Sequence, residues 1–141
     1  MNLTTNFKAQ EFLVSSERPD LAKQMLASPE DMVKMFYLSC IFLQPVRDVF
    51  GTVHILSGKR SLELNAAIGG SKFSDHLYTV GTPKAAVDFT CSKANMSDVY
   101  EHIKGTRHGS YGQLLYYRKS NFIHVSLPNG NRLNDAREWD K

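Results

Sequence analysis

The chain has 141 residues, of which 42% are hydrophobic and 22% charged, a composition that supports a buried core and excludes a disordered chain. Its formal net charge of +3 comes from basic residues spread along the sequence, so no nucleic-acid-binding surface is indicated. The longest apolar run, from Met35 to Leu43, is interrupted by Ser39 and is too short to cross a bilayer. The first residues lack the pattern of a signal peptide. We therefore expect a single domain over residues 1–141, with no membrane span and no nucleic-acid partner.

The N-terminal half predicts one long helix after a short entry segment. We expect a helix to start within the first dozen residues, with Phe7 and Phe12 docked on the core. Residues 28–31 read Ser-Pro-Glu-Asp, which is typical of a helix N-terminus: serine as the cap, proline at the first position and acids in the first turn. Apolar residues then recur at three- and four-residue spacing, as in a core-facing helix: Met32, Met35, Phe36, Cys40 and Leu43. This helix is expected to reach about Phe50, with a bend or interruption at Pro45.

The C-terminal half alternates between strand-like and helix-like segments. β-Branched and apolar residues predict strands over 52–56, 85–90, 113–117 and 122–127, with a tight turn at 119–121. Short helices are expected over 61–67 and over 97–104, the second capped by Ser97. From Pro128 onward the tail is polar, and we expect it to be irregular or partly helical. Together these elements predict an α+β fold, with helices packed on a small antiparallel sheet.

Three residues that are far apart in the sequence carry metal-binding chemistry: His76, Asp88 and His124. Two imidazoles and one carboxylate form a ligand set that holds a catalytic zinc ion and leaves a fourth position open for water. Each residue also has an ordinary interpretation, as a surface histidine, a turn or cap residue, and a core histidine. A metal site therefore requires a fold that brings the three side chains together.

The remaining histidines and the cysteines lack such a context. His54, His102 and His108 are expected to be structural or exposed. Cys40 and Cys91 lie in apolar or mixed stretches, and we expect buried free thiols rather than a disulfide. Aromatic residues cluster near the last two predicted strands and favour strand packing over a sugar-binding platform: Tyr111, Tyr116, Tyr117 and Phe122.

Several short motifs occur in a characteristic order. They include Ser-Gly-Lys-Arg-Ser at 57–61, Ser-Asp-His at 74–76 and His-Val-Ser at 124–126, together with residues 43–47, 51, 64–65, 68–71, 86–89 and 113–115. In this order the chain resembles the M15 peptidases, which are zinc D-Ala-D-Ala carboxypeptidases and their endolysin relatives. The resemblance runs from about Leu3 to Ser126. It is closest to the compact phage-type branch, in which an Asn-Phe…Glu-Phe segment also precedes the first long helix.

The resemblance implies a zinc metallopeptidase of small α+β fold, with the zinc on its sheet. The family's metal ligands correspond to His76, Asp88 and His124. Zn²⁺ held in this way lowers the pKa of bound water and polarises a scissile carbonyl. Arg60 corresponds to an arginine that stabilises the oxyanion or binds a substrate carboxylate. Ser74 corresponds to a hydrogen-bond donor for the substrate, and Gln113 to a glutamine that supports the site.

The chain departs from the family pattern in three places. Lys59 stands where the family usually has an aromatic residue, and the loop from Leu77 to Val87 is longer than usual. The family's catalytic glutamate lies shortly before the second histidine ligand, and its two alternative places hold Asn121 and Tyr117 here. A neutral tyrosine is a poor base at pH 7. Distant acids downstream of the aspartate ligand remain as alternatives: Glu101, Asp135 and Glu138.

Two functions follow from these observations. The first is a zinc-dependent peptidase that cleaves bacterial peptidoglycan stem peptides by zinc-activated water, as a carboxypeptidase or an endopeptidase. The second is a zinc-binding cell-wall-binding or virion structural protein that has lost turnover together with the glutamate. A folding unit without zinc is a third interpretation. The resemblance further implies a phage-encoded protein, made in the host cytoplasm, that acts at the cell wall, in the periplasm or in the virion.

Overall fold

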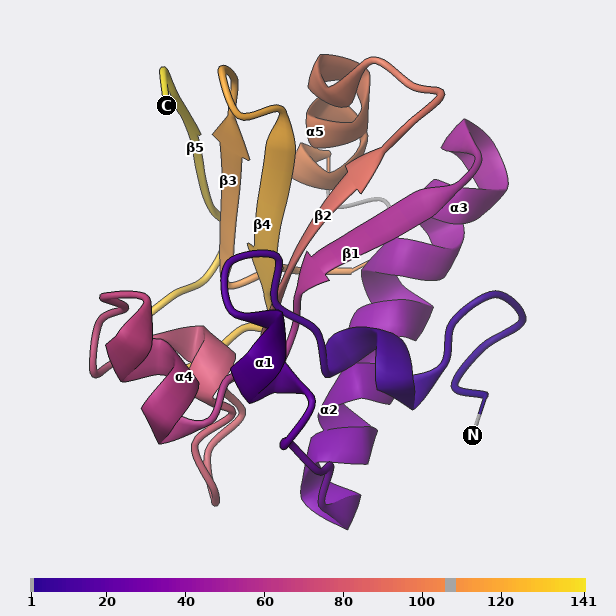
Figure 1. The fold of residues 1–141 in the computed structure, drawn as a ribbon. Coiled ribbons are helices and arrows are strands. Elements are labelled where there is room, and N and C mark those ends of the chain that lie inside the picture. The colour runs from indigo at the N-terminus through magenta and orange to yellow at the C-terminus, as the bar shows by residue number, and fades with distance from the viewer. Residues whose placement is uncertain (1, 106–108) are drawn as a thin grey trace.

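The computed structural model describes residues 2–105 and 109–141 (Figure 1). The strands described are β1 (Val53–Ser57), β2 (Ala86–Cys91), β3 (Gln113–Tyr117), β4 (Phe122–Ser126) and β5 (Asp135–Trp139). The α-helices are α1 (Pro19–Ala22), α2 (Pro29–Leu38), α3 (Gln44–Phe50), α4 (Leu62–Ala67) and α5 (Met96–Lys104). Shorter helical segments are the 3₁₀ turns η1 (Ala9–Phe12) and η3 (Asp75–Leu77) and the π-helical segment η2 (Ser39–Leu43).

The five strands form one sheet in the order β1-β2-β4-β3-β5. Neighbouring strands among β1 to β4 are antiparallel, whereas β5 runs parallel to β3. The predicted α+β class is therefore confirmed, but the sheet is mixed rather than wholly antiparallel. The difference comes from the tail, which was expected to be irregular or partly helical and instead forms β5. Charged residues along this edge strand hide the apolar alternation that marks a strand in a sequence.

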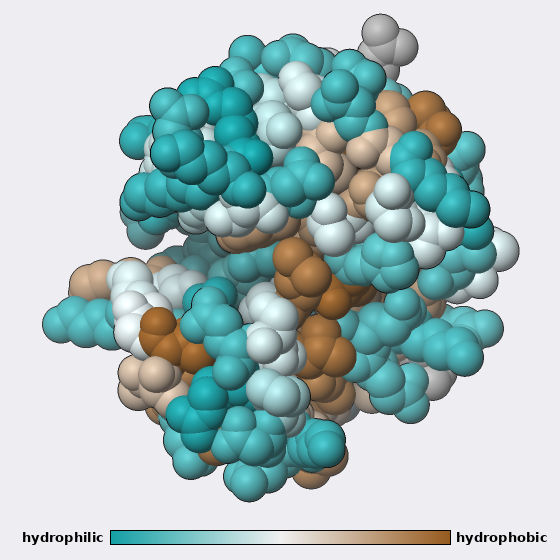
Figure 2. Space-filling model, turned by 45° about the horizontal axis from the view of Figure 1, so that its top comes forward, coloured by the Kyte–Doolittle hydropathy of each residue, from teal (hydrophilic) through white to brown (hydrophobic). Residues whose placement is uncertain are grey.

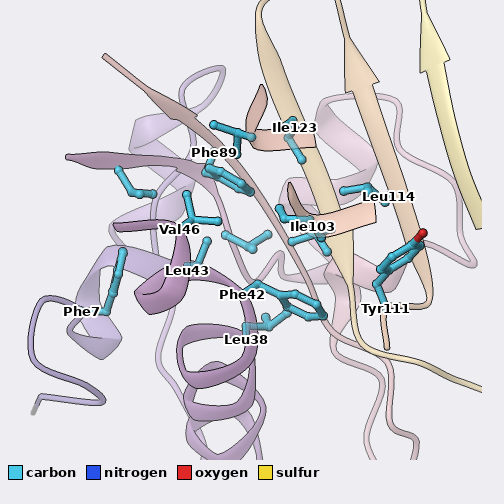
Figure 3. Close-up of a cluster of buried hydrophobic side chains, with 14 of the residues drawn as sticks. Phe7, Leu38, Phe42, Leu43, Val46, Phe89, Ile103, Tyr111, Leu114 and Ile123 are labelled. Atoms are coloured by element: carbon cyan, nitrogen blue, oxygen red, sulfur yellow. The ribbon is translucent and has the colours of Figure 1, made fainter. Parts of the chain in front are cut away.

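One face of the sheet is covered by helices and forms the core. Side chains alternate along a strand, so every second residue of the central strands lies on this face. These residues are buried: Val87, Phe89, Leu114, Tyr116, Ile123 and Val125. Figure 3 shows Leu43, Val46 and Ile103 from the helices close to Phe89 and Ile123 of the sheet. The opposite face carries the intervening strand residues, and α1 and α4 lie near one end of the sheet (Figure 1).

The predicted long helix consists of three consecutive segments, α2, η2 and α3. It begins with a capping box, in which Ser28 Oγ accepts from Asp31 N over 3.1 Å and Asp31 Oδ2 accepts from Ser28 N over 2.9 Å. The wider turns of η2 directly precede Pro45, which lacks the N–H that a regular helix uses at this place. The interruption expected near Pro45 is therefore present as a π-helical segment.

The buried stripe of this long helix differs from the predicted one. Phe36 is 43% exposed, and Cys40 lies at the surface rather than in the core. Polar residues take buried positions instead and hide the true phase of the stripe. Lys34 Nζ donates to the carbonyl oxygens of residues 78 and 79, and Ser39 Oγ donates to the carbonyl oxygen one turn earlier over 2.8 Å. Cys91 is buried, and both cysteines are free, as predicted.

Two smaller differences concern helix termini. The first dozen residues form only the 3₁₀ turn η1, although Phe7 and Phe12 are buried as predicted. Helix α5 is capped by Asn95 rather than Ser97, because Asn95 Oδ1 accepts from Ser97 N over 2.9 Å.

The face shown in Figure 2 is mainly hydrophilic, with separate apolar patches. No helix within the described ranges has the length and apolar character needed to cross a membrane.

Candidate metal centre

His76, Asp88 and His124 come together on the sheet face opposite the core. Asp88 lies within β2 and His124 within β4, and the antiparallel register places them directly opposite one another. His76 belongs to the turn η3, which is capped by Ser74 Oγ accepting from His76 N over 3.2 Å. Arg60 N also donates to His76 O over 2.7 Å, which ties this turn to the segment after β1. Two side chains thus come from paired strands and the third from a capped turn.

The three facing atoms form a nearly equilateral triangle. His76 Nε2 is 3.0 Å from Asp88 Oδ1 and 3.2 Å from His124 Nδ1. His124 Nδ1 is 2.8 Å from Asp88 Oδ1. A tetrahedral zinc ion with ligand atoms about 2.0–2.1 Å away holds these atoms roughly 3.3 Å apart. The triangle is therefore close to the size that a tetrahedral metal ion requires, and it provides three of the four ligands.

The second ring nitrogen of His76 decides which form of the imidazole faces the cluster. Nδ1 lies 2.7 Å from the carbonyl oxygen of Gly58, which can only accept, so Nδ1 carries the proton. Burial lowers the pKa of His76, with Asp88 partly opposing the shift, so the ring is neutral at pH 7. Nε2 then directs a lone pair toward Asp88 Oδ1. Two acceptors at this distance repel one another unless a cation lies between them.

Gly58 reaches His76 because it has no side chain. A Cβ atom at this position would lie 2.4 Å from the carbonyl oxygen of Phe12. The same oxygen accepts a hydrogen bond from Lys59 N over 2.9 Å. The segment after β1 is therefore pressed against η1, and this contact directs the Gly58 carbonyl toward the imidazole. The glycine of the Ser-Gly-Lys-Arg-Ser motif thus has a packing role.

Asp88 is ionised within the cluster. Burial opposes its ionisation, but its contacts with the two neighbouring imidazoles, including the hydrogen bond with His124, outweigh burial and hold the pKa of the carboxyl well below its usual range. His124 turns Nδ1 toward the other two residues, and its Nε2 is buried without a hydrogen-bond partner in the described part of the chain. An anionic carboxylate between two imidazoles is a donor set that suits Zn²⁺.

The cluster lines an open cavity of about 310 Å³. All six residues predicted for the site line this cavity: Arg60, Ser74, His76, Asp88, Gln113 and His124. The Arg60 side chain is 14% exposed, with Nη2 3.9 Å from Asp88 Oδ2 and Nη1 3.4 Å from Asn65 Oδ1. Its Nε is buried and has no partner among the residues described. The guanidinium therefore keeps hydrogen-bonding capacity beside the cluster.

Other residues of the cavity wall were missed by sequence reasoning. Asp75 belongs to the Ser-Asp-His motif, but nothing in its spacing assigned it a separate role. Arg132 and Trp139 come from the tail, where no strand was predicted. The parallel register of β3 and β5 places Trp139 opposite Tyr117, which also lines the cavity. Arg132 and Trp139 can be recognised as wall residues only once the pairing of the tail with β3 is known.

The distant acids considered as bases do not line the cavity. Glu101 lies on α5, and Asp135 and Glu138 form ion pairs with arginines near β5. Within the described residues, the carboxylates that line the cavity are Asp75 and Asp88. Because Asp88 belongs to the cluster, Asp75 is the described acid that remains next to it.

The other departures from the family pattern lie beside the cluster. Lys59 does not line the cavity; its Nζ is 2.5 Å from Asp31 Oδ2 and 2.9 Å from Leu26 O. The long loop after His76 is held against α2, because Lys34 Nζ lies 3.1 Å from two of its carbonyl oxygens. Both lysines thus connect segments of the site to α2.

The remaining predicted aromatic and histidine residues have mostly structural surroundings. His54 is exposed on β1, and the His102 ring packs edge-on against Phe50 with 5.3 Å between centroids. His108 lies outside the described residues. Tyr111 and Tyr116 are buried in the core as predicted, whereas Tyr117 lines the cavity and stacks on Phe122 at 4.3 Å.

An α+β fold with a His-Asp-His cluster in an open cavity is an arrangement that suits a metal-dependent hydrolase. The family described as Peptidase M15 matches residues 5–126. This range covers most of the sequence, so the chain belongs to the Peptidase M15 family. M15 peptidases are zinc-dependent, which places the chain among the metallopeptidases and makes the cluster the candidate zinc site. Neither the curated proteins nor the solved structures gave a match to the chain.

Proposed function

We propose that the protein is a zinc-dependent peptidase that cleaves bacterial peptidoglycan stem peptides, with His76, Asp88 and His124 as the metal ligands. The observation that carries this proposal is the triangle of ligand atoms, with sides of 2.8, 3.0 and 3.2 Å, on the wall of an open cavity. When bound, zinc supplies Lewis acidity, which polarises a carbonyl group and lowers the pKa of a water molecule. The surrounding side chains account for the rest of the reaction.

Arg60 and Tyr117 are donors for the carbonyl oxygen of the substrate. Burial raises the pKa of Tyr117, and Asp88 raises it further while Arg60 partly opposes the shift. Tyr117 therefore keeps its proton at neutral pH and acts as a hydrogen-bond donor rather than as a base. A neutral hydroxyl and a guanidinium on the cavity wall stabilise the negative charge that develops on the oxygen during attack.

Asp75 is the group that we assign to proton transfer. Its carboxylate lines the cavity and has a weak contact of 3.5 Å with Asn129 Nδ2. A carboxylate in this place takes a proton from the attacking water and returns it to the leaving amine. Ser74 and Gln113 line the same cavity and bind the peptide by hydrogen bonds. Asp75 thus takes the role of the glutamate that the chain lacks.

The substrate assignment rests on the resemblance to the compact phage-type branch of the family. We propose a phage-encoded endolysin-like enzyme that acts at the cell wall, in the periplasm or in the virion. Its target is either the terminal D-Ala-D-Ala bond or an internal bond of the stem peptide. Digestion of purified peptidoglycan, followed by mass spectrometry, distinguishes the two. Loss of one terminal alanine identifies a carboxypeptidase, and shortened stem fragments identify an endopeptidase.

A second function is favoured by one specific observation. Tyr117 stands at a place where the family carries a glutamate, and its raised pKa prevents it from replacing that base. A zinc-binding wall-binding or virion structural protein therefore remains the alternative. It predicts that the zinc-loaded protein sediments with peptidoglycan and releases no peptide. Equal hydrolysis of wall peptides by the Tyr117→Glu variant and by the wild-type protein would exclude this alternative.

A further inference from the structure

The C-terminal segment, residues 127–141, contributes to the cavity although it lies beyond the residues that the family matches. Arg132 precedes β5 and Trp139 ends it, and both line the cavity. The segment is fixed in place by its backbone. Asp135 N donates to Gly112 O over 3.0 Å, and Arg118 N donates to Trp139 O over 2.9 Å. The tail is therefore a built wall of the cavity.

Arg132 is free to bind an anion. Its Nη1 donates to Gln113 Oε1, at the first residue of β3, and this contact orients the guanidinium. Arg132 forms no ion pair with any acid in the described ranges 2–105 and 109–141. A guanidinium has five N–H donors in a planar fork that matches a carboxylate. Most of these donors remain available beside the cavity.

The strand register sets how far Gln113, the residue that holds Arg132, lies from His124 of the cluster. Leu115 of β3 lies opposite His124 of β4, and Gln113 is two residues further along β3. With the usual strand spacing and rise, the Cα atoms of Gln113 and His124 are roughly 8 Å apart. Because an extended peptide rises about 3.3–3.6 Å per residue, this separation corresponds to about two residues of substrate.

The charge of the cavity also favours an anionic ligand. Its two arginines, Arg60 and Arg132, are balanced by Asp75 and Asp88. A divalent cation in the cluster makes the cavity positive. Arg60 follows β1 and Arg132 is bound at β3, so in the strand order they lie on opposite sides of the cluster. A peptide that lies across the cluster would therefore meet Arg60 on one side and Arg132 on the other.

An aromatic surface lies further along the same cavity wall. The Trp139 and Tyr117 rings meet edge-on with centroids 5.2 Å apart, and Tyr117 stacks on Phe122. Trp139 and Tyr117 both line the cavity, so they present apolar area to a ligand bound there. The wall thus offers one anion-binding group at Gln113 and, four residues further along β3, one apolar surface.

We propose that Arg132 and Trp139 form a specificity subsite, in which Arg132 binds a carboxylate of the peptide about two residues from the bond held at the metal. Trp139, together with Tyr117, packs against an apolar part of the same peptide further along the wall. This subsite rests on the proposed peptidase function and names the feature of the substrate that the enzyme selects. The selected peptide carries a free carboxylate at that distance, and an amidated peptide is bound less tightly.

The test measures binding separately from cleavage. A synthetic stem pentapeptide with free carboxylates is compared by calorimetry with two versions, one amidated at the glutamate α-carboxylate and one at the C-terminus. Titrations use zinc-loaded protein and chelator-treated protein. In the chelator-treated protein, cleavage of the peptide does not interfere with the binding measurement. In wild type, at least one amidation is expected to weaken binding about tenfold to a hundredfold, as for loss of a charge-assisted hydrogen bond.

Arg132→Gln should abolish this discrimination, and Arg132→Lys should keep part of it. Arg137→Gln removes the same charge from β5 at a residue that does not line the cavity, and it should behave as wild type. Trp139→Ala should weaken the binding of all three peptides by a similar factor. Discrimination that is absent in wild type, or unchanged in Arg132→Gln, overturns the proposal. A protein that binds with this discrimination but releases no product contradicts only the proposed peptidase function.

Discussion

His76 Nδ1 lies 2.7 Å from the carbonyl oxygen of Gly58, and this contact links two of the sequence motifs. Because the carbonyl only accepts, it fixes the proton on Nδ1 and leaves Nε2 to face Asp88 and His124. The position of the carbonyl depends in turn on Gly58 packing against the backbone of Phe12. The orientation of His76 in the site is therefore set partly by η1, the 3₁₀ turn near the N-terminus.

Replacing Gly58 tests this dependence. In Gly58→Ala the new Cβ atom would collide with the carbonyl oxygen of Phe12, so the segment must shift. We expect a loss of about 1–3 kcal/mol in the free energy of unfolding and weaker zinc binding, measured by urea unfolding and metal titration. Gly130→Ala is the matched control, since no atom lies within 4 Å of its added Cβ. A Gly58→Ala protein with wild-type stability and zinc affinity would contradict this account.

The zinc-free protein is expected to lose stability as the pH falls from 7 to 5. Burial lowers the pKa of His76 below its ordinary value of 6.5. As the pH falls, the imidazole is therefore protonated at a higher pH in the unfolded chain than in the folded chain. The free energy of unfolding therefore falls with pH, by at most about 1.4 kcal/mol per unit from this residue. Urea unfolding of chelated protein measures the slope. His76→Gln should flatten it and the exposed His54→Gln should not, whereas equal slopes in all three would count against the assignment.

Asp75→Asn tests the assigned proton carrier. The change removes the basic carboxylate and preserves its size, so activity should fall about a hundredfold or more while zinc content stays at the wild-type level. Glu101→Gln and Glu138→Gln remove acids that do not line the cavity and should retain activity. Peptide release and metal content are measured on the same samples. Full activity in Asp75→Asn would show that another group moves the proton.

Tyr117→Phe tests the assignment of this residue as a donor. Loss of the hydroxyl leaves the ring packed on Phe122 and Trp139, so the fold should be retained. Activity should fall about tenfold to a hundredfold through kcat, with zinc content unchanged, because a donor to the developing oxyanion is lost. A change confined to KM would place Tyr117 in substrate binding instead.

The site residues that sequence reasoning predicted share a local signal. His76 and His124 lie in short motifs of fixed composition, and the β2–β4 register supplies the contact that sequence spacing alone leaves open. Gly58 and Arg60 lie in a motif of the same kind. Each residue taken singly also has an ordinary interpretation, so the prediction depended on the order of these motifs and on the family resemblance that the order carries.

The missed features depend on partners far along the chain. Arg132 and Trp139 reach the cavity because β5 pairs with β3, and the charged alternation of this edge strand resembles a polar tail. The phase of the long helix was predicted incorrectly at Phe36 and Cys40. Its buried Lys34 bonds loop carbonyls, and a charged residue in a core stripe conceals that stripe from hydropathy patterns. The features that could not be predicted from the sequence are therefore those that depend on tertiary contacts, such as strand pairing of the tail and hydrogen bonds of a buried lysine.

The most direct test of the central claim is the release of free amino groups from purified peptidoglycan by zinc-loaded protein, by the same protein after chelation, and by His124→Ala. His54→Ala serves as the control for loss of an exposed histidine. We predict release by the zinc-loaded wild type and by His54→Ala, loss of release on chelation with recovery when zinc is returned, and no release by His124→Ala. Equal release by the metal-stripped and zinc-loaded proteins, or no release by folded, zinc-loaded wild type, would contradict a zinc peptidase built on this cluster.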